Sequence, residues 1–237
     1  MSEPMVFSAQ REVQLRFLCP EDIGDVKKLC AEWFPIDYPD TWYEDITSNP
    51  KFYSLAATYH SKIIGIIVTE VKAKPKINKE DADILPSQYP ATVEVAYILS
   101  LGVVNDFRRH GIASLLLDSL LSYLTTSERH HCKAVYLHVL STNNIAIRFY
   151  ERRNFRPHSF LPYYYSIGGK PKDGYSYVLY LNGGQPPWSL LDYISHCGSV
   201  LAKLHPCALP VHIMRTIQGW LGRMLISSGP TCHKSQS

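Results

Sequence analysis

Residues 97–124, YILSLGVVNDFRRHGIASLLLDSLLSYL, decide how this chain folds. The apolar stretch 93–104 predicts a long buried strand, and the leucines from Leu115 onward recur at helical spacing. Between them, residues 108–113 (RRHGIA) form a turn at the start of the helix. N–H groups at a helix N-terminus, the helix dipole and a glycine that permits close approach can together bind an anion such as a pyrophosphate. Taken alone, this hexapeptide is equally well an ordinary helix start with a loop glycine.

The flanking sequence predicts a mixed α/β domain. Strands are predicted at 13–18, 52–59, 63–71, 134–140 and as a pair within 155–182 around the turn-rich GGKPKDG. Helices are predicted from Pro20 to Trp33, from Pro39 to Ile46 and over 143–153. Residues 74–90 are polar, contain three prolines and lack periodicity, so an exposed loop is expected there.

Composition narrows the class of protein. A chain of 237 residues with 46% hydrophobic and 19% charged residues fits a folded domain with an appendage. The six cysteines show neither CxxC nor zinc-like spacing, so no metal site is expected. The net charge of +3 and the absence of aromatic–basic interleaving argue against a nucleic-acid partner. No signal peptide or spanning segment is expected.

The order of motifs resembles the GNAT acetyltransferase superfamily. The strand, turn and helix at 97–124 are followed by a strand, by Asn143 and Asn144, and by a helix that contains Phe149 and Tyr150. The resemblance covers about residues 13–182 and implies a mixed, mostly antiparallel sheet flanked by helices. We therefore expect an acetyltransferase domain at 1–182 and an amphipathic C-terminal extension at 183–237.

The resemblance implies acetyl-CoA as the acetyl donor and no metal. In the family, the R-x-x-G-x-A turn binds the pyrophosphate, and a bulge in the preceding strand presents amides to the pantetheine and the thioester. The implied coenzyme contacts are Leu101, Gly102, Val103, Arg109, His110, Gly111, Ile112, Ala113, Ser114, Asn143, Tyr150, Glu151, Arg152 and Arg153.

Tyr97 and His138 are the catalytic residues that the resemblance implies, on strands that would be adjacent at the splayed centre of the sheet. Without the resemblance, each would more often be an ordinary packed side chain. The implied reaction is direct attack of an amine on the thioester in a ternary complex. An α-amine has a pKa near ~8 and a lysine amine near ~10.4, which slightly favours an N-terminal acceptor.

The segments WFPIDYPDTWY (33–43) and LPYYYS (161–166) resemble N-terminal acetyltransferases that act on chains beginning with Met. The expected acceptor is Met followed by Lys, Val, Ala, Leu, Ile or a similar residue. The implied acceptor contacts are Phe34, Pro35, Asp37, Tyr38, Leu99, Tyr164 and Tyr165, with Asp37 standing where the family has Glu. A hairpin over 155–182 that covers the groove would admit only a chain end. The alternatives are a lysine or histone acetyltransferase and a catalytically silent membrane adaptor.

The C-terminal extension predicts two amphipathic helices, at 188–203 and 211–226. The second combines an apolar stripe with Trp220 and a basic flank, which is typical of a helix lying in a membrane surface. Packing on the catalytic domain or a homodimer contact explains the pattern equally well. The resemblance favours the membrane, at the cytosolic face of the Golgi, with membrane proteins that have cytosolic N-termini as partners.

Overall fold

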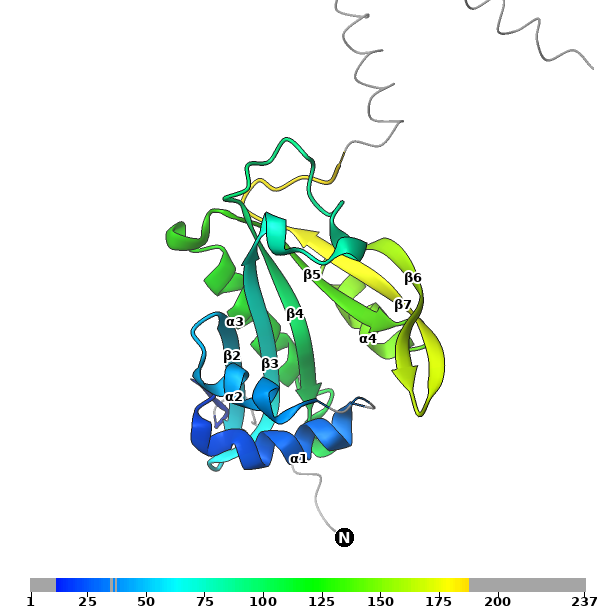
Figure 1. Ribbon diagram of the computed structural model, residues 1–237. Helices are drawn as coiled ribbons and strands as arrows, with labels where there is room; N and C mark the ends of the chain where they lie inside the picture. The colour runs from blue at the N-terminus through cyan, green and yellow to red at the C-terminus, as the bar shows by residue number, and fades with distance from the viewer. Residues whose placement is uncertain (1–11, 35, 37, 188–237) are drawn as a thin grey trace, which may run out of the picture. The chain divides into compact units, whose positions relative to one another are not determined.

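The structure, a computed structural model, describes residues 12–34, 36 and 38–187 (Figure 1). These residues lie within one compact unit that spans 1–187. The predicted helices of the C-terminal extension lie outside the described residues, as do Pro35 and Asp37. Within the described part of the chain, no helix has the length and apolar character needed to cross a membrane.

A seven-stranded sheet forms the centre of the domain, in the order β1-β2-β3-β4-β5-β7-β6. Only β4 and β5 run parallel, and every other neighbouring pair is antiparallel. The predicted mixed, mostly antiparallel sheet is therefore confirmed. The strands are β1 (Gln14–Phe17), β2 (Phe52–Tyr59), β3 (Lys62–Ala73), β4 (Glu94–Val103), β5 (Cys132–Leu140), β6 (Arg156–Ile167) and β7 (Lys170–Tyr180).

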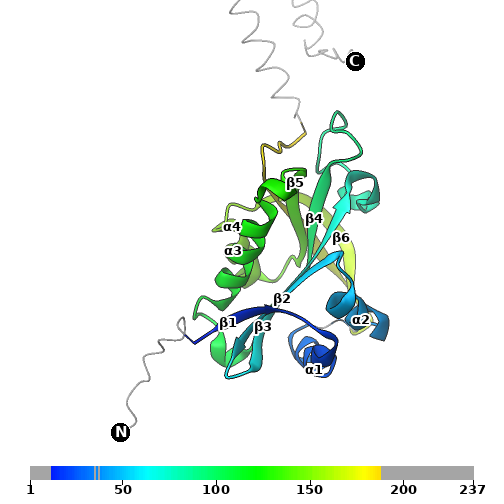
Figure 2. The same ribbon diagram turned by 90° about the vertical axis from the view of Figure 1, so that its left-hand side faces the viewer.

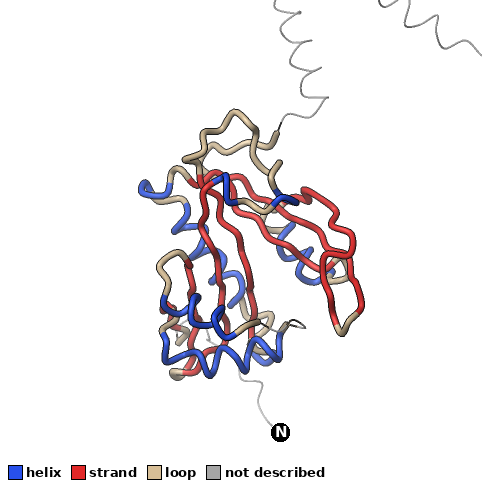
Figure 3. The backbone as a smooth tube through the Cα atoms, viewed as in Figure 1, coloured by secondary structure: helices blue, strands red, loops and turns tan. Residues whose placement is uncertain are grey.

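Helices cover both faces of this sheet (Figures 2 and 3). α1 (Ile23–Trp33) and α2 (Asp40–Ser48) lie on one face, and α3 (Ile112–Leu124) and α4 (Asn144–Glu151) lie on the other. The helix predicted from Pro20 begins as a 3₁₀ turn, Pro20–Asp22, before α1. There the Asp22 carboxylate accepts hydrogen bonds from the Cys19 N–H at 2.9 Å and from the Arg16 guanidinium at 2.7 Å.

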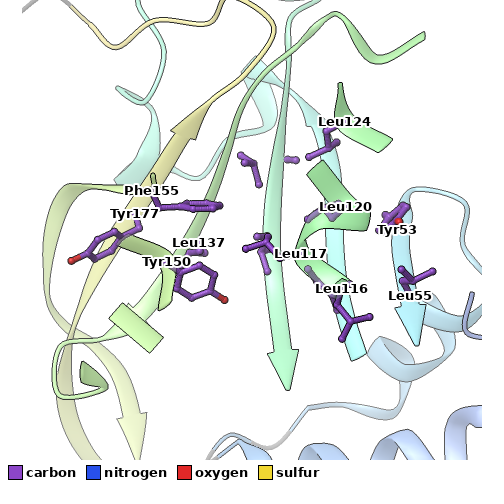
Figure 4. Packing of buried hydrophobic residues seen from close by; sticks show 14 of the residues in the cluster. Tyr53, Leu55, Leu116, Leu117, Leu120, Leu124, Leu137, Tyr150, Phe155 and Tyr177 are labelled. Atoms are coloured by element: carbon purple, nitrogen blue, oxygen red, sulfur yellow. The ribbon is translucent and has the colours of Figure 1, made fainter. Parts of the chain in front are cut away.

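The main core lies between the sheet and the helices α3 and α4 (Figure 4). The apolar stripe of α3 is completely buried and packs on β2 to β5, through Leu116, Leu117, Leu120 and Leu124. Each such side chain contributes about 1.5–3 kcal/mol by leaving water. Tyr150 and Phe155 pack beside Leu137 on the α4 side. This burial fixes α3 and α4, and hence the residues at their N-termini, relative to the strands.

β4 and β5 pair over only part of their length. The parallel register runs from Glu94 and Cys132 to Ile98 and Leu137, and then stops. Beyond that point β5 continues to pair with β7, while β4 continues to pair with β3. The two strands diverge there (Figure 1), so the main chain of each has an open side. The predicted splayed centre of the sheet is confirmed.

Residues 74–90 form a loop as predicted, but the loop is not exposed throughout. Asp81 and Ile84 are completely buried and Leu85 is nearly so, in a second core with residues of β4, β5 and β7. The segment contains two 3₁₀ turns, Lys74–Lys76 and Lys79–Asp81. It is held by the Lys74 ammonium, which donates to three carbonyls at 2.8–3.1 Å, those of Pro86, Ser87 and Tyr89. Such irregular packing leaves no periodic signal in the sequence.

The turn predicted across GGKPKDG is shorter than expected. Only Gly168 and Gly169 form it, both with positive φ, and the remaining five residues are the start of β7. Opposite them, β6 is irregular between Leu161 and Tyr165. Asp173 and Gly174 therefore lie in a strand, where they face the tyrosines of β6.

Candidate active site

A bulge in β4 lies where the strand separates from β5. Ile98 pairs with Thr69 of β3 and Ser100 pairs with Val68, so two residue steps on β4 face one step on β3. Leu99 is the additional residue. The bulge that the family resemblance implied in this strand is therefore present, and it lies just before Leu101 and Val103.

The bulge determines which amides of β4 face the open side. After it, the Val104 N–H donates to the Ile64 carbonyl of β3 at 2.9 Å. Because main-chain groups alternate in direction along a strand, the N–H groups of Leu101 and Val103 point away from β3. The Arg108 side chain donates from Nε to the Val103 carbonyl at 2.9 Å, which agrees with this direction. Two N–H groups thus face the side on which β5 no longer pairs.

The turn before α3 has the backbone of an anion site. Arg109 has φ of 64°, and Gly111, the N-cap of α3, has φ of 83° and ψ of 0°. Left-handed residues separated by one other residue turn successive N–H groups toward a common concave side. Arg109, His110 and Gly111 are all exposed. The helix that follows has 13 residues, and its dipole adds to the attraction for an anion.

Packing limits how four of the predicted coenzyme residues near this turn and in β4 could meet a coenzyme. The Ile112 side chain is buried in the core, so it can meet a coenzyme only through its main chain. Ala113 and Ser114 are partly buried in the first turn of α3. Gly102 has a packing role, because a Cβ there would lie 2.1 Å from the Trp33 ring of α1. The missing side chain lets α1 approach the open part of β4.

The predicted coenzyme residues of α4 have partners within the protein. The Asn143 side chain accepts from the Ala146 N–H at 3.1 Å and caps the helix. Glu151 accepts a hydrogen bond from the Tyr177 hydroxyl at 3.1 Å, and Arg153 pairs with Asp118. Tyr150 is buried and Arg152 is exposed. Contact of these residues with a coenzyme stays a prediction.

A second cluster lies at the end of the paired part of β4 and β5. The hydroxyls of Tyr97 and Tyr164 lie 2.9 and 2.7 Å from Nδ1 of His138. Nε2 of His138 lies 3.0 and 2.9 Å from the two oxygens of the Asp81 carboxylate. The His138 side chain is 2% exposed and that of Asp81 is 0% exposed. We call these four residues the His138 network.

The chemistry of the His138 network follows from its hydrogen bonds. The Asp81 carboxylate can only accept, so Nε2 of His138 carries the proton that it donates to Asp81. Nδ1 is then the basic nitrogen, with one lone pair directed at the tyrosine hydroxyls. Burial, first of all, raises the pKa of Tyr97 and of Tyr164 above the usual range. Both tyrosines are therefore hydroxyls that can donate to Nδ1 and accept a proton from outside.

Tyr97 is held on both sides of its ring. It stacks on Tyr136 at 4.8 Å between centroids, and the Lys72 ammonium lies 5.0 Å from the centroid of the Tyr97 ring. Lys72 is itself almost fully buried and pairs with Glu70 at 3.2 Å. These contacts restrict the ring, so the hydroxyl of Tyr97 has a defined position beside His138.

An aromatic corner connects α1 to α2 beside the bulge. The Tyr38 ring lies edge-on to Phe34 at 6.3 Å and stacks on Trp42 at 4.1 Å, and Leu99 packs in the same cluster. Burial raises the pKa of Tyr38 to about 12. Burial likewise raises the pKa of Tyr165 on β6 above its usual range.

The structure thus groups the described candidates into two sets. Leu101, Val103 and the turn at 109–114 supply main-chain donors, whereas Tyr97, His138 and Tyr164 supply side chains that can move a proton. Asp81 was missed, because it lies in the segment taken for an exposed loop. The one sequence signal for it was the apolar pair Ile84 and Leu85, which indicated that the segment packs against the domain.

Comparison with known proteins identifies the fold. The acetyltransferase (GNAT) family matches residues 23–155, which is more than half of the chain. The chain belongs to the GNAT acetyltransferase family. As a GNAT member it is an acyltransferase.

Within the GNAT family, the chain is similar to N-alpha-acetyltransferase 60 proteins over nearly its whole length. That of Danio rerio is 58% identical over 97% of this chain and 95% of its own. That of Drosophila melanogaster is 53% identical over 91% of this chain and 86% of its own. A histone acetyltransferase of Arabidopsis thaliana, MCC1, is 30% identical over 76% of this chain and 74% of its own.

Solved GNAT structures are similar as well. Arabidopsis thaliana NAA60 in complex with acetyl-CoA has a TM-score of 0.65 and 30% identity, over 72% of this chain and 99% of that chain. Arabidopsis thaliana Naa50 in complex with the bisubstrate analogue CoA-Ac-MVNAL has a TM-score of 0.57 and 26% identity, over 71% of this chain and 98% of that chain.

Proposed function

We propose that the protein transfers the acetyl group of acetyl-CoA to the α-amine of an N-terminal methionine, by direct attack in a ternary complex. The observation that carries the proposal is the position of the His138 network. It lies where β4 and β5 part, beside the open amides of the bulge and the aromatic corner. The N-terminal acetyltransferase relatives and the acetyl-CoA complex of the similar NAA60 support the activity and the donor.

The donor is held by main-chain groups. The α3 turn binds the pyrophosphate through N–H groups and the helix dipole, with Arg109 adding positive charge. The N–H groups of Leu101 and Val103 bind the pantetheine and thioester region, where a hydrogen bond to the carbonyl oxygen stabilises the developing oxyanion. The pyrophosphate and the thioester are thus fixed by two successive elements of one chain segment.

The acceptor amine loses its proton through the His138 network. A tyrosine hydroxyl accepts the proton of the amine, directly or through a water, as its own proton passes to Nδ1 of His138. No tyrosinate forms, which suits hydroxyls whose pKa burial has raised. The Asp81 carboxylate stabilises the resulting imidazolium through Nε2. A network with two hydroxyls on one nitrogen offers one tyrosine for the amine while the other holds His138.

Selectivity for methionine is assigned to the aromatic corner. Phe34, Tyr38 and Leu99 present apolar surface beside the bulge, which suits an unbranched thioether side chain. The analogue bound by the similar Naa50, CoA-Ac-MVNAL, carries a peptide that begins with Met and Val. Pro35 and Asp37 of the same corner lie outside the described residues.

A peptide library tests the proposal. The full-length chain is incubated with acetyl-CoA and peptides that differ in their first two residues, and products are read by mass spectrometry. We expect acetylation of the α-amine of peptides that begin with Met followed by Lys, Val, Ala, Leu or Ile. Peptides that begin with Ser or Ala serve as controls. Equal rates on all N-termini would show that the aromatic corner does not select methionine.

The same experiment distinguishes a lysine acetyltransferase, which the distant histone acetyltransferase relative keeps as a second candidate. Matched peptides with a blocked N-terminus and an internal Lys should remain unmodified. The higher pKa of the lysine amine, about 10.4 against about 8, leaves less neutral amine for attack. Faster modification of the blocked peptides would favour lysine as the acceptor. The intact His138 network opposes a catalytically silent adaptor.

We further propose that residues 183–237 bind the protein to the cytosolic face of the Golgi membrane, where proteins with cytosolic N-termini would meet it. The amphipathic sequence pattern supports the membrane contact, and the choice of the Golgi rests on the family resemblance. A variant truncated after Pro187 should lose sedimentation with anionic vesicles and keep peptide acetylation. Sedimentation of the truncated chain would place the membrane contact in the catalytic domain. A fall from two chains to one chain per particle in solution on truncation would instead assign the extension to a homodimer.

A further inference from the structure

The tyrosines of β6 are carried by a strained stretch of backbone. Tyr163 has φ of 56°, in the left-handed region that side chains with a Cβ avoid. The residue is 75% exposed, so burial does not offset the cost of this conformation. Another interaction must therefore hold Tyr163 in place.

That interaction comes from Asp173 on β7. The Asp173 carboxylate accepts a hydrogen bond from the Tyr163 N–H at 2.9 Å. Leu161 pairs with Gly174 and Tyr165 pairs with Lys172, so three residues of β6 face Asp173 alone. The carboxylate thus replaces the strand partner that the bulged segment lacks.

Asp173 also connects this bulge to the strand that carries His138. Its main-chain carbonyl accepts from the Ser141 N–H, directly after β5, at 3.0 Å. The next residue, Gly174, pairs with Leu140 of β5. A Cβ on Gly174 would lie 3.0 Å from the ring of Tyr165, so the absence of a side chain leaves room for that ring. Asp173 and Gly174 together determine how the β6 tyrosines lie against the end of β5.

This arrangement determines the position of the Tyr164 hydroxyl. It directly follows the left-handed residue and lies 2.7 Å from Nδ1 of His138. We propose that Asp173 is a positioning residue for acetyl transfer: by holding the Tyr163 N–H it fixes the β6 bulge and thereby places the Tyr164 hydroxyl on His138. This inference rests on the proposed function, because it concerns the same proton relay.

The experiment measures kcat and KM of the full-length chain for a Met-starting peptide, with acetyl-CoA saturating. Asp173→Ala removes the acceptor and should lower kcat by about tenfold, since small misplacements of a catalytic group are costly. Asp173→Asn keeps an acceptor oxygen and should stay within about twofold of the wild type. The melting temperatures of both variants are compared with that of the wild type.

Two variant backgrounds distinguish a loss of positioning from a general loss of structure. In a Tyr164→Phe background there is no hydroxyl to place, so Asp173→Ala should lower kcat by less than about twofold. In a Tyr163→Gly background the left-handed conformation carries little cost, so the loss caused by Asp173→Ala should again be small. An equal loss of kcat in all three backgrounds would overturn the proposal.

Further outcomes are distinguishable. If the single Asp173→Ala variant does not fold, the comparison within the Tyr163→Gly background still decides, because there the proposal requires a folded and active double variant. A wild-type chain that acetylates no peptide would count against the proposed function. An active wild type with a fully active Asp173→Ala variant would overturn only the role of Asp173.

Discussion

The donor and acceptor sides of the site are built from different kinds of group. The donor side consists of main-chain N–H groups, at the β4 bulge and at the start of α3, where Gly111 adopts a left-handed conformation. The acceptor side consists of side chains, and the His138 network joins residues from the 74–93 segment, β4, β5 and β6.

The two sides of the site are sensitive to different kinds of substitution. Main-chain donors survive most substitutions, because every residue except proline supplies an N–H, so the donor side depends on backbone conformation. Buried side-chain networks depend on each member, since the loss of one leaves the others without a partner. Substitutions should therefore separate coenzyme affinity from turnover according to the side they affect.

The largest expected effect is on the acceptor side. His138→Ala removes the proton acceptor and should lower kcat by about 10²–10⁴-fold, the range expected for a general base. Acetyl-CoA affinity, measured by calorimetry, should remain within about twofold. The matched control is His158→Ala, which removes a histidine that pairs with Asp83 at 2.9 Å outside the His138 network. Turnover that survives in the His138 variant would show that the acceptor side does not depend on this side chain.

A substitution on the donor side should instead lower the affinity for acetyl-CoA. At φ of 83°, Gly111→Val places a branched side chain in a left-handed position next to the phosphate site, and acetyl-CoA affinity should fall by about 100-fold or more. The control is Gly169→Val, which imposes similar strain at φ of 72° in the β6–β7 turn, where a Cβ meets no neighbour. Equal loss of affinity in both variants would assign the effect to strain rather than to the phosphate.

Asp81→Asn should have a smaller effect than the loss of His138 itself. The amide can donate to Nε2 and so favour the wrong tautomer, with a proton on Nδ1, and we expect kcat to fall by about 10–100-fold. Peptide KM and acetyl-CoA affinity should change little. Asp83→Asn, on the same segment but with a side chain that is 77% exposed, is the control. An equal response to both changes would indicate that the segment, and not the tautomer, matters.

Tyr136→Phe should have the smallest effect, and on stability rather than turnover. The Tyr136 hydroxyl is buried without a hydrogen-bond partner among the described groups, so its removal should raise the free energy of unfolding by up to about 1 kcal/mol. Stacking on Tyr97 is kept, and kcat should remain close to that of the wild type.

The same variant gives a pH test. Burial raises the pKa of Tyr136 above the unfolded value of about 10. A raised pKa contributes stability that is present below the unfolded pKa and is lost as the pH rises toward the folded one. Above about pH 10, the stability of the wild type should therefore fall more steeply than that of Tyr136→Phe in urea titrations. Parallel curves would show that this hydroxyl is not held neutral by burial.

The donor side could be predicted from sequence because its signals are local. The apolar strand, the glycine turn and the leucine stripe of α3 are consecutive, and each acts on its neighbours in the chain. The place of Gly111 at the start of α3 was therefore predicted correctly from the residues, whereas the bulge before Leu101 was implied by the family resemblance alone. The contacts of Glu151 and Arg153 with Tyr177 and Asp118 were not, because they join separate elements.

The acceptor side could be predicted only in part. The hydrophobic pattern predicts the strands that carry Tyr97 and His138, and the family resemblance implied that the two residues meet. Asp81 depends on an aperiodic segment that packs through 3₁₀ turns and the Lys74 contacts. The position of Tyr164 depends on the left-handed residue Tyr163 and on the side chain of Asp173, ten positions after Tyr163. Neither feature leaves a mark in residue periodicity, so tertiary structure is needed to see them.

The single additional residue in β4, Leu99, interrupts the ladder between β3 and β4 at the candidate active site. Deleting Leu99 would give β4 an unbroken ladder with β3, because Ile98 and Ser100 already pair with consecutive residues there. The same deletion would remove the bulge from the point where β4 leaves β5, and with it the local bend and twist that a bulge gives the strand just before Leu101 and Val103.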